Sequence, residues 1–260
     1  MLQDKSVVHP SSLPPAARPR LFAEFVTSPE EIKEVQKLRY DVFCEEYNVT
    51  LPTNSYWNGH PIDADEIDEG CLHLVVREGQ TLEPVGYTRV LTQDLAKKLG
   101  SFYSAHEFDI SNIEKIDGRI MEIGRTCIHP EHRNGATISV LWSRLAKYML
   151  ENDYQYLFGC ASISLADGGT SFASIMPTLR ENHMADENLR VIPKLPLETH
   201  AKPCETKTQL PPLLKAYMKM GARICGEPCW DPEFNVADVF VVLDIEQVAN
   251  RYAKRFLKAS

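Results

Sequence analysis

The 260-residue sequence has no long apolar run, whereas a membrane-spanning helix needs about 20 consecutive apolar residues. Its first residues lack the apolar segment of a secretory signal peptide. It holds seven cysteines but no Cys-x-x-Cys pair, and no histidine pair with metal-like spacing accompanies them. These absences argue against a membrane protein, a secreted disulfide scaffold and a zinc site. We therefore expect a cytoplasmic protein with reduced thiols and no bound metal.

The sequence also lacks an excess of positive charge. Its formal net charge is −8, and residues 21–80 hold 13 acidic but only 4 basic side chains, a local balance of −9. Such a protein is poorly suited to bind nucleic acid, because the phosphate backbone attracts basic surfaces. A concentrated acidic segment instead suits a cationic substrate.

Composition is that of a soluble globular protein, with 43% hydrophobic and 25% charged residues. Residues 1–20 contain four prolines and no periodic pattern, so we expect a flexible N-terminal arm there. The remaining residues, 21–260, are predicted to form a single domain. The length allows one large domain or two small ones.

Hydrophobic periodicity and turn residues predict an alternation of strands and helices. A central strand, a turn, a helix and another strand form a βαβ-type unit, which favours an α/β fold with a mixed sheet. Ser28 is predicted to cap the first helix, with Glu31 three residues later. The predicted strands cover residues 21–26, 71–77, 85–91, 119–128, 154–164 and 237–244, and the predicted helices follow Ser28 or cover residues 132–150 and 213–220.

Two charged residues stand in the otherwise apolar central strand. Regular alternation would place Glu122 and Gly124 on one face of the sheet and Arg125 on the other. Buried charges need partners, so a structural ion pair and a catalytic role are both open from this pattern alone.

The turn after that strand is the second informative feature. Arg133, Asn134, Gly135 and Ala136 lead into a helix, and the first amides of a helix attract anions. Glycine permits close approach of the backbone to a ligand. The alternative is an ordinary strand-to-helix turn in which Gly135 only relieves crowding.

These stretches carry a family resemblance. Residues 121–136, 154–162, 210–221 and 231–238 resemble the bacterial ornithine-lipid N-acyltransferases, acyl-carrier-protein-dependent enzymes of the GNAT superfamily. A more distant resemblance is to acyl-homoserine-lactone synthases. Its matching positions are Leu38, Arg39, Phe43, Asp65, Asp68, Arg89, Glu122 and Arg125. The resemblance covers residues 21–245 and implies the GNAT fold, a central mixed twisted sheet flanked by helices.

The implied reaction is attack of an amine on a thioester carbonyl. The amine must lose a proton, and Glu122 is the expected general base, directly or through a water molecule. Backbone amides of the central strand would stabilise the oxyanion. Arg125 would hold Glu122 or the acidic loop in place, or form a purely structural salt bridge.

The other matching positions receive substrate-binding roles from the resemblance, each with an alternative. Asp65 and Asp68 would recognise a cationic amino acid or organise Arg39 and Arg89; the alternative is a solvated loop. Phe43 would cover the acyl site or belong to the core.

The turn from Arg133 to Ala136 departs from the usual coenzyme A-binding pattern of GNAT enzymes. It is one residue shorter between arginine and glycine and lacks a second glycine. An acyl carrier protein presents a phosphopantetheine arm without an adenosine pyrophosphate, so this turn favours acyl carrier protein over coenzyme A as acyl donor. We expect no permanently bound cofactor. A basic docking face for the acidic carrier protein is predicted from Arg133, Arg144, Lys147, Lys215, Lys219 and Arg223.

The leading hypothesis is transfer of a fatty or 3-hydroxy fatty acyl group to the α-amine of an amino acid such as ornithine, giving a lyso-aminolipid. One alternative is an acyl-homoserine-lactone-type synthase that uses S-adenosylmethionine. Another is a non-catalytic acyl-carrier or lipid-binding protein on a GNAT scaffold. The basic segment 251–258 would touch the inner face of an anionic membrane or form a plain capping helix.

Overall fold

The computed structural model describes residues 13–14, 20–45, 55–204 and 208–246. Nearly all of the predicted N-terminal arm and the whole basic segment 251–258 lie outside these residues. No helix in the described part is both long and apolar enough to cross a membrane. All seven cysteines are described and none forms a disulfide, as predicted.

Hydrogen bonds order the strands of the main sheet as β1-β4-β5-β7-β8-β12-β10, with β11 also paired to β12. The β7–β8 pair is parallel, whereas the pairs β1–β4, β4–β5, β8–β12 and β10–β12 are antiparallel. A parallel pair needs a crossover connection, and helix α4 provides it. The predicted mixed sheet and its βαβ unit are therefore confirmed.

The chain divides into two compact units, described separately here. Unit 1 is formed by Met1–Val90 and Arg125–Tyr148, and unit 2 by Leu91–Gly124 and Met149–Ser260. Strand β7 contributes its first half to unit 2 and its second half to unit 1. The expectation of a single domain over residues 21–260 stays a prediction.

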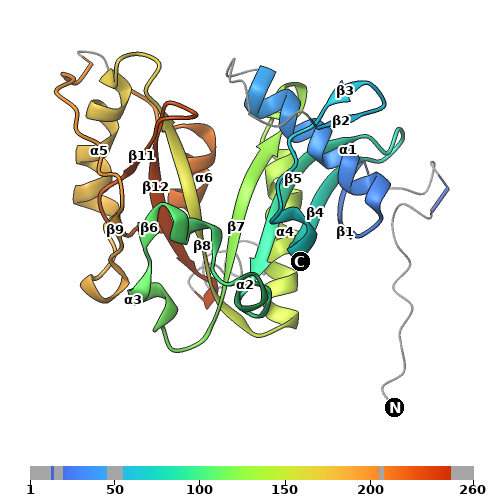
Figure 1. The fold of residues 1–260 in the computed structure, drawn as a ribbon, viewed down its shortest axis with the longest axis horizontal. Helices are drawn as coiled ribbons and strands as arrows, with labels where there is room; N and C mark the ends of the chain where they lie inside the picture. Colours follow the sequence, from blue (N-terminus) through green and yellow to red (C-terminus); the bar gives the residue numbers. More distant parts are fainter. Residues whose placement is uncertain (1–12, 15–19, 46–54, 205–207, 247–260) are drawn as a thin grey trace, which may run out of the picture. The chain divides into compact units, whose positions relative to one another are not determined.

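Unit 1 contains the end of the main sheet formed by β1, β4 and β5, together with several helices (Figure 1). Its elements are β1 (Leu21–Val26), α1 (Pro29–Tyr40), η3 (Asp41–Glu45), β2 (Tyr56–Trp57), β3 (His60–Pro61), η4 (Asp68–Gly70), β4 (Leu72–Glu78), most of β5 (Pro84–Thr92), the end of β7 (Arg119–Ile128), η6 (Pro130–His132) and most of α4 (Ala136–Glu151).

Helix α1 begins as predicted. The Ser28 hydroxyl accepts a hydrogen bond from the Glu31 backbone N–H at 3.3 Å, and Pro29 occupies the first helical position. The buried face of this helix joins a core shared with β1, β4, β5 and β7. That core contains Val26, Val35, Leu38, Val42, Val75, Tyr87 and Cys127, with Phe43 packed against it.

Two details around β7 differ from the prediction. Arg125 has a φ of 51°, a left-handed conformation that side chains rarely adopt within a strand. Regular alternation of side chains between the two faces of the sheet therefore breaks at Arg125. The faces predicted from alternation do not hold beyond this residue. Helix α4 begins at Ala136 rather than at His132, because Pro130–His132 forms a separate 3₁₀ turn.

Unit 2 contains the other part of the sheet. Its remaining elements are α2 (Gln93–Leu99), η5 (Tyr103–His106), β6 (Phe108–Asp109), α3 (Ser111–Glu114), β8 (Tyr154–Ser164), α5 (Thr170–His183), η7 (Glu187–Leu189), β9 (Ile192–Pro193), α6 (Pro212–Met220), β10 (Arg223–Ile224), β11 (Cys229–Asp231) and β12 (Val236–Asp244). Helix α6 ends at Gly221, whose φ of 101° provides the predicted left-handed cap.

The core of unit 2 is built on a row of phenylalanines. Phe158 on β8 stacks on Phe240 of β12 at 5.4 Å between ring centroids. Phe102 contacts Phe158 at 4.9 Å and Phe108 contacts Phe240 at 5.6 Å, both edge to face. This row fixes the segment 102–108 against the two central strands of the unit.

Helix α5 was absent from the sequence prediction. Gly168 and Gly169 precede it, Pro177 lies inside it, and small polar residues fill its first turns. These residues weaken the local helical pattern. Burial of Phe172, Ile175, Met176 and Leu179 stabilises the helix in the folded chain.

Candidate functional site

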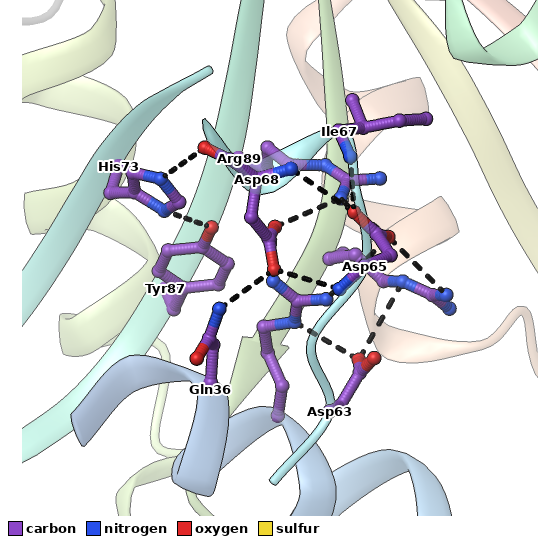
Figure 2. A network of polar contacts seen from close by, with 10 residues as sticks. Gln36, Asp63, Asp65, Ile67, Asp68, His73, Tyr87 and Arg89 are labelled. Carbon is purple, nitrogen blue, oxygen red and sulfur yellow. Dashed lines mark hydrogen bonds and ion pairs between the residues drawn. The ribbon is translucent and has the colours of Figure 1, made fainter. Parts of the chain in front are cut away.

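Unit 1 holds a largely buried network of three arginines and three aspartates, part of which is labelled in Figure 2. Arg39 comes from the last turn of α1, Arg89 from β5 and Arg125 from β7. The aspartates follow β3 in the acidic loop and are Asp63, Asp65 and Asp68. Elements distant in the sequence therefore converge on one loop.

Arg39 is the centre of this network, because it reaches all three aspartates. Its Nε lies 3.0 Å from Asp63 Oδ2, its Nη1 2.6 Å from Asp68 Oδ1 and its Nη2 3.8 Å from Asp65 Oδ2. The Arg39 side chain is 0% exposed. Charges buried this deeply persist only when they are paired.

The other two arginines complete the pairing. Arg89 Nη1 lies 2.6 Å from Asp65 Oδ1 and 3.0 Å from Asp68 Oδ1. Arg125 Nε lies 3.6 Å from Asp63 Oδ2, and its Nη2 lies 4.0 Å from Asp65 Oδ2. Arg125 thus lies in ion-pair contact with the acidic loop, and Asp65 and Asp68 both lie in ion-pair contact with Arg39 and Arg89. The functional roles expected of these residues stay predictions.

Formal charge within the network balances, with three guanidinium groups against three carboxylates. Burial alone would raise the pKa of Asp68, but the charges of Arg39 and Arg89 outweigh it and lower the pKa to about 2. The acidic loop thus owes its conformation to internal ion pairs. Recognition of a cationic amino acid by Asp65 and Asp68 stays a prediction.

A chain of hydrogen bonds joins the network to strands β4 and β5. His73 Nε2 lies 2.9 Å from the Asp68 carbonyl oxygen, and His73 Nδ1 lies 2.8 Å from the Tyr87 hydroxyl. Since a carbonyl oxygen only accepts, Nε2 carries the proton and Nδ1 accepts from Tyr87. Gln36 Nε2 donates to Asp68 Oδ2 at 2.9 Å.

Sequence reasoning missed Gln36, Asp63, His73 and Tyr87. Asp63 belongs to the acidic run, but composition cannot tell which acid in a run reaches a buried arginine. The other three look like ordinary strand or helix positions. Only their neighbours in the folded chain give them a role.

Phe43 was expected either to cover the acyl site or to belong to the core. It packs against the core of unit 1, and the Arg125 guanidinium carbon lies 5.9 Å from its ring centroid. The ring therefore contributes to packing and borders the network. A covering role over an acyl chain stays a prediction.

The turn Arg133–Ala136 is exposed. The Asn134 side-chain oxygen accepts from the Ala136 backbone N–H at 3.0 Å, a local turn contact two residues along the chain. Gly135 has a φ of 86°, which explains the glycine without a ligand. Arg133 Nε donates to the Ile128 carbonyl oxygen at 3.1 Å. Donor binding by these four residues stays a prediction.

Glu122 lies in unit 2 and is 3% exposed. Its Oε2 accepts from the Tyr103 backbone N–H at 2.7 Å, and its Oε1 accepts from the Ser104 backbone N–H at 2.7 Å. The Ser104 hydroxyl donates to the same Oε1. A carboxylate offers about four acceptor positions, so at least three are in use. These hydrogen bonds join the η5 turn to β7 through the Glu122 carboxyl group. The role of Glu122 as general base stays a prediction.

Further titratable groups adjoin Glu122 within unit 2. Ser104 Oγ lies 3.6 Å from Cys160 Sγ on β8, and Glu107 follows the η5 turn. Asp238 on β12 is buried and accepts from the Ser162 hydroxyl at 2.6 Å. Among the described residues, no group of three His, Cys, Asp or Glu side chains could hold a metal ion.

Comparison with known proteins gives these observations a context. Residues 38–143 match the acetyltransferase (GNAT) domain family. The chain is 31% identical over 247 residues to an L-ornithine N(alpha)-acyltransferase of Rhodobacter capsulatus, covering 88% of this chain and 92% of that protein. It is 34% identical to one of Agrobacterium fabrum, covering 85% and 80%.

Solved structures agree on the fold. The acyl-homoserine-lactone synthase LasI matches with a TM-score of 0.50 and 14% identity, covering 86% of this chain and 90% of that one. FeeM, an N-acyl amino acid synthase from uncultured soil microbes, matches with a TM-score of 0.50 and 11% identity, covering 89% and 94%. The expected GNAT fold is confirmed.

Proposed function

This chain belongs to the L-ornithine Nα-acyltransferase family and is an acyltransferase, and we propose that it moves a fatty acyl group from acyl carrier protein to the α-amine of ornithine. The product would be an N-acylornithine, a lyso-aminolipid. The observation that carries the proposal is similarity along nearly the whole chain, 31–34% identity to four relatives with this one name.

The chemistry starts when Glu122 takes a proton from the α-ammonium group and leaves a neutral amine. The amine attacks the thioester carbonyl, so that a C–N bond forms and the C–S bond breaks. The second proton that the nitrogen loses passes to the phosphopantetheine thiolate as it leaves. Backbone N–H groups of β7 would stabilise the oxyanion of the tetrahedral intermediate.

The arginine–aspartate network would act as a scaffold in this reaction. Its charges are paired internally, so it serves to hold the loop 63–70 in one conformation beside β5 and β7. Arg125 belongs to the network through Asp63 and also follows Glu122 by three positions on β7. The network would therefore fix the part of β7 that belongs to unit 1.

Acyl carrier protein is the proposed donor because the turn after β7 has only one glycine. Gly135 and an exposed Arg133 offer a smaller anion site than a coenzyme A pyrophosphate requires. We also propose that the basic segment 251–258 contacts an anionic membrane, into which a lyso-aminolipid product would pass. This segment lies outside the described residues.

The decisive experiment extracts lipids from cells that express the chain and identifies amine-bearing acyl products by mass spectrometry. Wild-type protein should yield N-acylornithine. Glu122→Gln should reduce turnover by about 10²- to 10⁴-fold, the range for loss of general base catalysis. Glu83→Gln, an exposed carboxylate between β4 and β5, is the matched control and should behave as wild type.

The outcomes separate the alternatives. An acyl-homoserine lactone in the medium would indicate the lactone-synthase alternative. A Glu122→Gln variant within twofold of wild type would defeat the base assignment, and the absence of any acyl product would support a non-catalytic binding protein.

A further inference from the structure

A chain of polar groups leads away from Glu122 into the interior of unit 2. The Ser104 hydroxyl donates to Glu122 and lies 3.6 Å from the thiol of Cys160. The Cys160 thiol in turn interacts with the Glu107 carboxylate as a hydrogen-bond donor. Four side chains from β7, η5, β8 and the segment before β6 thus follow one another.

The two ends of this chain differ in their hydrogen bonding. Glu122 accepts at least three hydrogen bonds, which stabilise its anionic form. Glu107 Oε2 is buried and has no hydrogen-bond partner among the residues that the structure describes. An unpartnered buried carboxylate oxygen is costly as an anion and is relieved when it binds a proton.

The surroundings of Glu107 act in the same direction. Burial first, and then the charges of Asp238 on β12, Asp231 on β11 and Glu122 on β7, raise its pKa to about 8. Only the Cys160 thiol opposes this among its main influences. Burial and the neighbouring carboxylates also raise the pKa of Cys160, so its thiol keeps its proton near neutral pH.

We propose that Ser104 and Cys160 relay the amine proton from Glu122 to Glu107, which stores it during acyl transfer. The inference rests on the proposed function, in which Glu122 receives that proton. Ser104, Cys160 and Glu107 act through Glu122 and do not touch the substrate.

Each step of the relay conserves protons. The ammonium gives its proton to Glu122, and that proton moves to the Ser104 oxygen while the Ser104 proton moves to Cys160 sulfur. The Cys160 proton moves to Glu107. Glu122 is again a carboxylate, Ser104 and Cys160 again carry one proton each, and Glu107 is a neutral acid.

The test follows the pH dependence of kcat with saturating ornithine and acyl carrier protein. The wild-type rate should rise to a plateau with an apparent pKa near 8, because Glu107 must be ionised to receive the proton. Glu107→Gln and Cys160→Ala should lower kcat by about 10- to 100-fold, remove this pH limb and leave KM for ornithine unchanged.

Two variants separate the relay from a structural role. Cys160→Ser keeps a donor and acceptor at the same place and should restore kcat to within about threefold and bring back the pH limb. Cys204→Ser, at the exposed thiol, is the control for cysteine replacement and should match wild type. Melting temperatures of all variants identify any loss of folding.

A proton inventory in mixed H₂O and D₂O gives an independent readout. A relay moves several protons together and gives a curved plot for wild type and Cys160→Ser, and a straight plot for Cys160→Ala. An unchanged pH profile in folded Glu107→Gln or Cys160→Ala would overturn the relay while leaving the proposed function intact. Absence of acylornithine from the wild-type protein would overturn the proposed function itself.

Discussion

Arg39 and Asp68 form an ion pair of 2.6 Å in which the two side chains are 0% and 4% exposed. The two residues lie on α1 and η4, and Arg89 from β5 shares the same carboxylate oxygen. Removing one partner of a buried pair leaves the other charge uncompensated, which costs far more than the pair contributes. This asymmetry makes the network testable.

Asp68→Asn should lower the free energy of unfolding by about 3–5 kcal/mol, because Arg39 and Arg89 both lose a buried counter-charge. Urea denaturation measures the change. The control is Glu227→Gln, which removes the Arg180–Glu227 pair of 2.6 Å, where the side chains are 42% and 54% exposed. That change should cost less than about 1 kcal/mol. Equal losses would show that Asp68 is not paired as described.

His73 should make stability depend on pH. Burial lowers its pKa below 6.5, so the neutral ring is the form that folding favours. Its contribution is complete above pH 6.5 and is lost as the pH falls through the lowered pKa, because the unfolded chain then binds the extra proton.

His73→Gln keeps hydrogen-bonding groups but cannot titrate. Melting temperatures between pH 5 and 8 should fall less steeply toward acid in this variant than in wild type. His106→Gln, at an exposed histidine, should retain the wild-type slope. Parallel curves for wild type and His73→Gln would contradict the prediction.

The backbones of β7 and β8 approach so closely at Gly159 that a side chain cannot fit. A Cβ there would lie 2.3 Å from the Ile123 carbonyl oxygen, and backbone cannot yield as a flexible side chain does. Gly159→Ala should therefore destabilise the protein by about 1–3 kcal/mol. Thermal unfolding measures this, and Gly124→Ala is the control for folding, since its Cβ would meet nothing within 4 Å. A Gly159→Ala variant as stable as Gly124→Ala would refute the close approach.

Exposed basic residues near the start and on the outer side of α4 should attract an acidic carrier protein. Arg144 is unsuitable as a probe, because its guanidinium carbon lies 4.9 Å from the Phe25 ring centroid and reversal would disturb packing. Arg133→Glu and Lys147→Glu, both at exposed positions, should raise KM for acyl carrier protein about 10-fold with kcat unchanged.

Two controls test whether the effect comes from carrier-protein docking: a change of ionic strength and a small acyl donor that has no protein part. The KM difference should shrink at high ionic strength, since exposed charges are screened. KM for a small acyl-pantetheine donor should not change. Lys97→Glu on α2, also exposed, should leave the carrier KM as in wild type, and a rise equal to that of Arg133→Glu would indicate a general charge effect.

Local sequence signals located the long strands β1, β4, β5, β7, β8 and β12, but not the strands of two or three residues. Ser28 and Glu31 marked the start of α1, Gly221 marked the end of α6, and strand β7 has the predicted bounds, Arg119–Ile128. Helix α5 was missed because Pro177 and two preceding glycines weaken its local pattern, and its four buried apolar residues stabilise it only after folding.

Candidate site residues could be predicted where the local sequence pattern was unusual, such as a charged residue in an apolar strand. Glu122 and Arg125 stood out as charges in an apolar strand, and Asp65 and Asp68 as part of an acidic run. His73, Tyr87 and Cys160 gave no such signal, because each is an ordinary residue at an ordinary strand position.

The sequence by itself determined the order of the long strands and the family to which the chain belongs, since both depend on residues close together in the chain. Tertiary structure alone decided which charges meet. Arg39 pairs with aspartates 24 and 29 positions away, and Ser104 meets Cys160 56 positions away. Burial gives these contacts their effect on pKa. A charged group or a thiol changes its proton affinity only when folding removes water and brings specific neighbours close to it.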